Sequence, residues 1–411
     1  MDAFMKNQTL PRYLHTMLQI LLLFFAIFPK DYKLHSSVYY SVQIIIVGGA
    51  LVGSSIPLYM ATESVVKLEI FATIIPQLAD LLIFTYFSYK EKELLKLIHS
   101  LASKNSNNEL ERTNRFLRAN FVTYFILHTA WASLFIVHTL IYLLSGHEFS
   151  HKYSIMIPFW LSCDVRPDNR LCWKTDSSWE LWLANIFTTI AVGFEYASYC
   201  TACILYSVFM ANVWIHLQTL RTSIRSMASR MKSQCRINFM KFGKVEEYDD
   251  AVMEEFYENI KNQQMIRGYC NEIIEVMRGY VSIFLAEFWG TLVFLGFTSI
   301  MEVKNDRLLV IKTAIISVSG AIGFVVHCVY AQMMTDLNEM ILHEMADIPW
   351  YEQGIRFRKN YLMCLTHNQK SIQVTAGGMF TFNYGFSMNC LKTMYSFLNM
   401  MLLHYKRKGS L

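Results

Sequence analysis

The chain has 411 residues, of which 54% are hydrophobic and only 17% are charged, and its net charge is +5. Soluble globular proteins usually carry about 25% charged residues, and the apolar residues here fall in long uncharged runs such as 38–61 and 119–144. A helix needs about 20 apolar residues to cross a bilayer. The composition excludes a soluble enzyme, a disulfide-rich scaffold and a disordered chain, and it predicts an all-α polytopic membrane protein. The small net charge gives no indication of nucleic-acid binding.

Seven membrane-spanning helices are predicted in chain order from these runs. They are 38–61, 68–89, 119–144, 181–214, 280–301, 308–334 and 375–404. The apolar run 17–28 is too short to span and is interpreted as an uncleaved interfacial or partly buried helix. Two connections are long: 145–180 forms an outer loop, and 215–279 has helical character.

Basic residues are divided unevenly between the two sides of this seven-span arrangement. One side consists of 1–37, 90–118, 215–279 and 335–374, and it carries more than twice as many lysines and arginines as the other. Because cytosolic loops are enriched in basic residues, the N-terminus is predicted to be cytosolic and the C-terminus extracellular. This orientation is the reverse of a G-protein-coupled receptor.

Motifs for catalysis are missing from the sequence. It contains no nucleotide-binding GxxxxGK[ST] loop and no GxSxG nucleophile motif, and His343-Glu344 is not followed by a second histidine at the zinc-protease spacing; each of these motifs would supply a mechanism. The sequence therefore predicts that the protein is not an enzyme and that it needs neither a cofactor nor a metal.

Five ionisable residues lie within the predicted spans: Asp80, Glu195, Glu287, Lys312 and Lys392. Ionisable groups inside a membrane are costly and usually functional. Asp80 and Glu287 are also compatible with hydrogen bonds to neighbouring helices. Glu195, in the middle of its span, either lines a cavity or pairs with a polar neighbour.

The outer halves of the third and fourth spans are rich in aromatic residues. Ligand pockets are mostly apolar and aromatic, with a few polar groups, although core packing remains the alternative for each ring. The predicted ligand-binding residues are Trp131, Phe135, His138, Tyr142, Phe187, Phe194, Glu195 and Tyr196.

The last span carries a mostly polar stripe at helical spacing. It consists of Asn389, Lys392, Thr393, Ser396, Asn399, Met400, Leu403 and His404, which share one helical face. A polar face turned towards lipid is disfavoured. Copies of this helix around an axis would line a pore, with Ser396, Met400, Leu403 and His404 as pore and gate residues. A polar seam between helices is the alternative.

Two cysteines of the outer loop, Cys163 and Cys172, lie on the oxidising side of the predicted topology. Disulfides persist in such compartments, so a bond between these cysteines is a candidate. His147 and His151 lie nearby, but the spacing of these two histidines and the two cysteines taken together matches no strong zinc pattern.

The last 60 residues resemble the insect odorant receptor family. The matching features are the pair Trp350-Tyr351, the basic stretch 356–359, the polar segment 368–370, the pair Ala376-Gly377, and the sequence LKTMYSFLNMMLL at 391–403. The length, the seven spans and the cytosolic N-terminus agree with the same family.

The resemblance implies an odorant-tuned subunit of a heteromeric, odorant-gated, non-selective cation channel in the plasma membrane of an olfactory sensory neuron. It implies a tetramer with insect olfactory co-receptor subunits and a small volatile ligand bound in the outer half of the bundle within 1–374. It also implies a pore lined by 375–411 and a cytosolic subunit anchor from 215–279 and 335–374. The residues that the resemblance assigns to the anchor are Trp350, Tyr351 and Tyr395.

At the gate, the resemblance implies roles for Met400 and His404, with Leu403 between them. His404 departs from the apolar residue usual in the family, and the basic run 406–408 follows it. If all four subunits of a tetramer carried this basic run, the ring of positive charge at the outer mouth would repel cations. The basic run therefore favours one or a few copies of this chain per tetramer.

Two other functions remain open. A gustatory receptor channel of the same superfamily is disfavoured because its common ending, with a Gln-Phe pair, is missing here. A secondary transporter would place its site near the bilayer midplane, close to Glu195 or Lys392.

The predicted orientation can be tested with terminal tags. A tag after Leu411 should be labelled by an antibody on intact cells, and a tag before Met1 should be labelled only after permeabilisation, because basic loops stay in the cytosol. Labelling of the N-terminal tag on intact cells would contradict the orientation.

Overall fold

The computed structural model describes residues 33–60, 64–103, 162–165, 171–174, 178–238, 245–302, 307–369 and 371–407. The predicted third span, 119–144, and the apolar run 17–28 lie outside the described residues.

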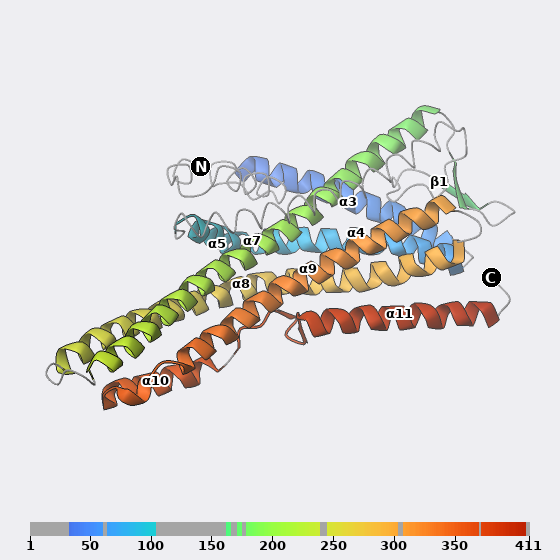
Figure 1. The fold of residues 1–411 in the computed structure, drawn as a ribbon. Coiled ribbons are helices and arrows are strands. Elements are labelled where there is room, and N and C mark those ends of the chain that lie inside the picture. Colours follow the sequence, from blue (N-terminus) through green and yellow to red (C-terminus); the bar gives the residue numbers. More distant parts are fainter. Residues whose placement is uncertain are drawn as a thin grey trace.

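Long helices account for most of the described chain (Figure 1). They are α3 (Lys33–Met60), α4 (Ser64–Tyr89), α7 (Ser178–Asn238), α8 (Val245–Glu302), α9 (Arg307–Ala346) and α11 (Tyr384–Arg407). The shorter elements are α5 (Glu91–Ser103), the 3-10 helix η3 (Trp350–Glu352), α10 (Ile355–Asn368) and two β-hairpins. A mostly helical fold is therefore confirmed.

Among the described residues, three helical stretches are long and apolar enough to cross a membrane: Gly193–Ser233, Val252–Ile300 and Thr313–Glu352. Shorter apolar stretches occupy Ser41–Ser55 in α3 and Ile74–Tyr89 in α4. Each of these five stretches overlaps one of the predicted spans. The total of seven spans and the orientation of the termini stay predictions.

Helices α7 and α8 are far longer than a bilayer requires. They contain 61 and 58 residues, whereas about 20 residues cross the hydrocarbon core. Each helix is apolar at the end that contains its predicted span and rich in charged residues at the other, where the two are joined around 239–244. The helical character predicted for 215–279 is thus present as direct extensions of two spans.

The helices α7, α8 and α9 pack together around the imidazole of His327, which is fully buried. Its Nδ1 lies 2.8 Å from the carbonyl oxygen of Gly323, and its Nε2 lies 2.9 Å from the hydroxyl of Tyr280. A carbonyl only accepts, so Nδ1 carries the proton and the neutral ring accepts from Tyr280 at Nε2. Phe284 and Tyr206 stack on the ring at centroid distances of 4.2 and 4.5 Å. This cluster, called here the His327 core, is both apolar and hydrogen-bonded.

The end of the bundle remote from the apolar halves is closed by η3 and α10 (Figure 1). Trp350 stacks on Tyr361 at 5.7 Å, and the Tyr361 hydroxyl donates to the carbonyl oxygen of Met345 at 2.6 Å. Arg221 of α7 forms an ion pair with Glu344 of α9 at 3.2 Å. These contacts define a distal bundle built from α10 and the charged ends of α7, α8 and α9.

The predicted last span, 375–404, begins too early. Residues Thr375–Ala376 (β3) and Phe380–Thr381 (β4) form a two-stranded hairpin, and α11 begins at Tyr384. Gly377 and Gly378 turn the chain with φ of 58° and 78°, values that glycine adopts at little cost. Asn383 then caps α11, because its Oδ1 accepts from the Phe386 amide at 2.7 Å. The hairpin and the cap set the start of the helix.

A second hairpin pairs β1 (Ser162–Val165) with β2 (Leu171–Lys174). Its register sets Cys163 opposite Trp173 and Cys172 opposite Asp164. The two cysteines therefore occupy adjacent, offset positions on paired strands, and a disulfide between them stays a prediction. The two hairpins are the described exceptions to the all-α class that the composition predicted.

Candidate functional site

A cavity of about 80 Å³ lies between α4, α7, α8 and α9 in the apolar half of the bundle. Its lining is mainly aliphatic and aromatic, with three carboxyl groups and three hydroxyls. The lining residues are Pro76, Asp80, Glu195, Tyr199, Glu287, Phe288, Thr291, Leu292, Ile316, Ser319 and Gly320. Such a combination of apolar walls and a few polar groups is typical of a ligand site.

The carboxyl groups in this cavity are shielded from solvent. Asp80 on α4 and Glu195 on α7 are each 4% exposed, and Glu287 on α8 is half-buried. Asp80 interacts electrostatically with both glutamates. Ser198 lies beside Asp80 and accepts a hydrogen bond from Gln43 Nε2 at 2.7 Å. A polar network thus reaches the cavity from α3 through α7.

Some oxygen atoms in the cavity lack a hydrogen bond. Glu195 Oε2, Glu287 Oε2 and Thr291 Oγ1 are buried and receive none from the residues that the structure describes. Buried polar groups are nearly always hydrogen-bonded, so these atoms offer unused acceptors to an occupant of the cavity.

The remaining predicted ligand-binding residues are distributed differently. Phe187 and Phe194 are half-buried on α7 and are not among the described residues that line the cavity. The backbone of Tyr196 belongs to α7, and its side chain lies outside the described part. Four predicted residues fall in the segment that the structure does not describe: Trp131, Phe135, His138 and Tyr142.

Sequence reasoning named Asp80 and Glu287 as unusual but did not assign them to the cavity. It also missed Tyr199, Phe288 and Thr291, which line the cavity. For Asp80 and Glu287, the signal available in the sequence was an isolated carboxyl group within an apolar run. The aromatic and hydroxyl residues give no such signal, because comparable side chains are spread along all the spans.

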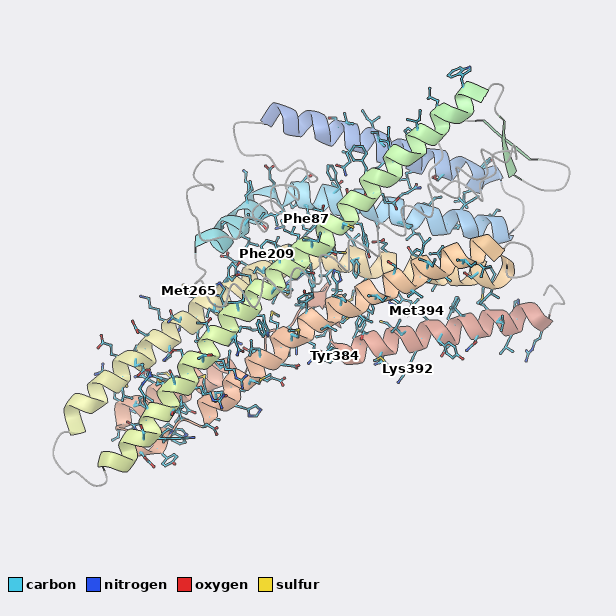
Figure 2. All side chains as sticks on the ribbon, turned by 45° about the horizontal axis from the view of Figure 1, so that its top comes forward. Phe87, Phe209, Met265, Tyr384, Lys392 and Met394 are labelled. Carbon is cyan, nitrogen blue, oxygen red and sulfur yellow. The ribbon has the colours of Figure 1, made fainter. Side chains whose placement is uncertain are left out.

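The polar stripe of α11 faces away from the rest of the chain. Met394 is buried towards the bundle, whereas Lys392 lies on the other side of the helix (Figure 2). Leu398 packs so closely on α8 that a Cβ at Gly296 would lie 2.9 Å from its methyl carbons. The four predicted pore and gate residues are all exposed: Ser396, Met400, Leu403 and His404. An exposed polar face on an apolar helix requires a protein or water partner.

The predicted anchor residues occupy two separate places. Trp350 is half-buried and stacks on Tyr361 within the distal bundle, while its neighbour Tyr351 is 60% exposed. Tyr395 lies on α11 and is 69% exposed. Trp350 therefore has a partner within its own chain, and the two tyrosines present rings on the surface.

Comparisons with known proteins agree with this architecture. The profile of the 7tm odorant receptor family matches residues 61–395. The structure of the insect olfactory receptor OR5 from Machilis hrabei is similar, with a TM-score of 0.74 and 12% identity over 95% of this chain and 98% of that chain. Its complex with eugenol gives the same TM-score and identity over 96% and 100%. No protein of curated function matches the sequence.

The exposure of α11 can be tested with introduced cysteines. Met400→Cys and His404→Cys should react with a membrane-impermeant thiol reagent if their face lines an aqueous path, whereas Leu398→Cys, packed against Gly296, should react more slowly. Labelling rates in membranes of expressing cells provide the measurement, with the unmodified chain as the background. Faster reaction at position 398 than at 400 and 404 would show that the wrong face was assigned.

Proposed function

Because the chain belongs to the 7tm odorant receptor family, we propose that it is an odorant-tuned subunit of a ligand-gated, non-selective cation channel. It acts in the plasma membrane of an olfactory sensory neuron and assembles with co-receptor subunits into a heterotetramer. The observation that carries this proposal is the mainly apolar cavity between α4, α7, α8 and α9 in a chain of this family.

The cavity is suited to a small volatile ligand. Its aliphatic and aromatic lining removes apolar surface from water, which is the main source of affinity for such molecules. The eugenol complex of the Machilis hrabei receptor supports this assignment by analogy of fold. The predicted aromatic residues of span 119–144, with Trp131 foremost, would complete the wall of the pocket.

The face of α11 supports the pore assignment. Within the described part of the chain, helix α11 packs on α8 and α9, and Ser396, Met400 and His404 are exposed. Around a central axis, these faces from several subunits would share an aqueous path. Met400, Leu403 and His404 form the constriction, whose apolar members oppose wetting in the closed state.

A continuous set of aromatic contacts joins the cavity to α11. Phe288 lines the cavity and stacks on Phe324 at a centroid distance of 4.1 Å. Phe324 meets Phe382 and Phe386, at the base of α11, at 5.7 and 6.1 Å. A ligand that prefers one arrangement of Phe288 can therefore bias the position of α11 through packed side chains, in proportion to its differential affinity for the two states.

A secondary transporter is the alternative, and the buried carboxyls of the cavity are the observation that favours it, since proton and ion pathways use such groups. Current recordings distinguish a ligand-gated channel from a transporter. A channel passes current when a ligand binds without any ligand gradient, whereas a transporter moves the ligand itself.

The experiment that tests the proposal is to express the chain with and without an insect olfactory co-receptor and to record currents against an odorant panel. We expect ligand-evoked cation currents with the co-receptor, together with surface expression. Surface expression without any evoked current, combined with uptake of a labelled ligand, would replace the channel by the transporter.

The aromatic route to α11 predicts a coupling variant. Phe324→Leu should lower the maximal ligand-evoked current by roughly tenfold, which lies within the usual range for coupling between sites, because the stacked contact with Phe288 is lost. The matched control is Phe297→Leu, a change at a buried phenylalanine of α8 that is not one of the four rings named above. Equal currents for both variants at equal surface expression would exclude the route.

A further inference from the structure

The cavity contains a cluster of acidic side chains. Asp80, Glu195 and Glu287 reach it from three helices, and no basic side chain is among the described residues that line it. Glu195 Oε2 and Glu287 Oε2 accept no hydrogen bond from the described part of the chain. Burying a carboxylate without a counter-charge is costly, especially within a membrane. The cavity therefore favours a positively charged occupant.

A metal ion fits this cavity poorly. Across the described ranges, no three His, Cys, Asp or Glu side chains are grouped so that they could hold a metal. Hard cations such as Ca²⁺ or Mg²⁺ require six or more oxygen ligands, whereas Pro76, Leu292 and Ile316 contribute hydrocarbon to the lining. An occupant that has both a positive charge and a hydrocarbon part can contact the carboxyl groups and the apolar walls of the cavity at the same time.

Two aromatic rings line the cavity beside the carboxyl groups. Tyr199 follows Glu195 by four residues on α7, and Phe288 follows Glu287 directly on α8. Residues four apart lie on the same helical face, and both rings belong to the cavity lining. An ammonium group is attracted to the face of an aromatic ring as well as to carboxylates, so these rings support a cationic head group.

We infer that the cavity between α4, α7, α8 and α9 binds a small protonated amine, with its ammonium group at Glu195 and Asp80 and its hydrocarbon part against Phe288 and Ile316. This inference rests on the proposed function, because it names the ligand class of the same receptor site. The volume of about 80 Å³ is several times what one water molecule needs, which favours a short alkyl or aryl amine. Glu287 adds to the negative potential that attracts the cation.

The first arm of the test compares matched ligands on the wild-type receptor. Pentylamine, cyclohexylamine and benzylamine differ from pentanol, cyclohexanol and benzyl alcohol in the charged group alone at neutral pH, because alkylamines titrate near pH 10. Each amine should activate at a concentration about tenfold or more below its alcohol, as expected for one charge-assisted contact. Equal or stronger responses to the alcohols would overturn the inference and leave the odorant-gated channel standing.

The second arm removes the negative charges. Glu195→Gln and Asp80→Asn should each raise the half-maximal concentration for cyclohexylamine by about tenfold and change that for cyclohexanol by a smaller factor, because the alcohol makes no charge-assisted contact. Glu339→Gln, at an exposed position of α9, is the matched control and should change neither response. An amine response unchanged by both cavity variants would show that their charges are balanced within the protein, and it would overturn the inference.

A binding measurement separates the inference from the channel proposal. If no ligand evokes a current at normal surface expression, the proposed function fails. The purified receptor should still show a higher melting temperature with cyclohexylamine than with cyclohexanol, because a ligand stabilises the state that binds it. Equal melting temperatures would overturn the amine inference by themselves, whether or not the cavity variants fold.

Discussion

Helices α7, α8 and α9 pack against one another around the buried imidazole of His327. This packing fixes the position of the three helices relative to one another, and with it the apolar half and the distal bundle that they share. The ring is hydrogen-bonded at both nitrogens and stacked on both faces, so its polar atoms are satisfied inside an apolar core. Polar groups satisfied in this way specify one arrangement of the surrounding helices, because any slip would leave them unpaired. Residues that line the cavity lie within about three helical turns of this core on each of the three helices: Glu195, Glu287 and Ser319.

The same three helices continue beyond this core into the distal bundle. Their length lets one rigid element carry both the apolar half with the cavity and the charged half with η3 and α10 (Figure 1). A shift of one of these helices at the cavity therefore also displaces its end in the distal bundle, because close-packed interiors have low compressibility and transmit strain. Among the described residues, helix α11 is attached differently, through one face and a hairpin, and its polar face is exposed.

The carboxyl groups and the aromatic route belong to one functional arrangement. Glu287 and Phe288 are adjacent on α8, so the residue that contributes charge to the cavity is bonded to the residue that stacks on Phe324. An occupant of the cavity therefore acts at the start of the path towards α11. The cost of burying carboxyls among hydrocarbon is consistent with a site retained for binding rather than for stability.

The sequence by itself determined the membrane class, five spans among the described helices, the polar stripe of α11 and the unusual carboxyls, because hydropathy and helical periodicity are local properties of the chain. The meeting of Asp80, Glu195 and Glu287 was decided only by the tertiary structure, since spacing along the chain does not say which helices pack together. The sequence also did not show that α7 and α8 continue as single helices past their apolar segments. Backbone hydrogen bonding can continue through polar residues, so a drop in hydropathy does not mark the end of a helix. The hairpin before α11 has strands of two residues, which are too short to give an alternating pattern, and its turn depends on the φ angles of Gly377 and Gly378.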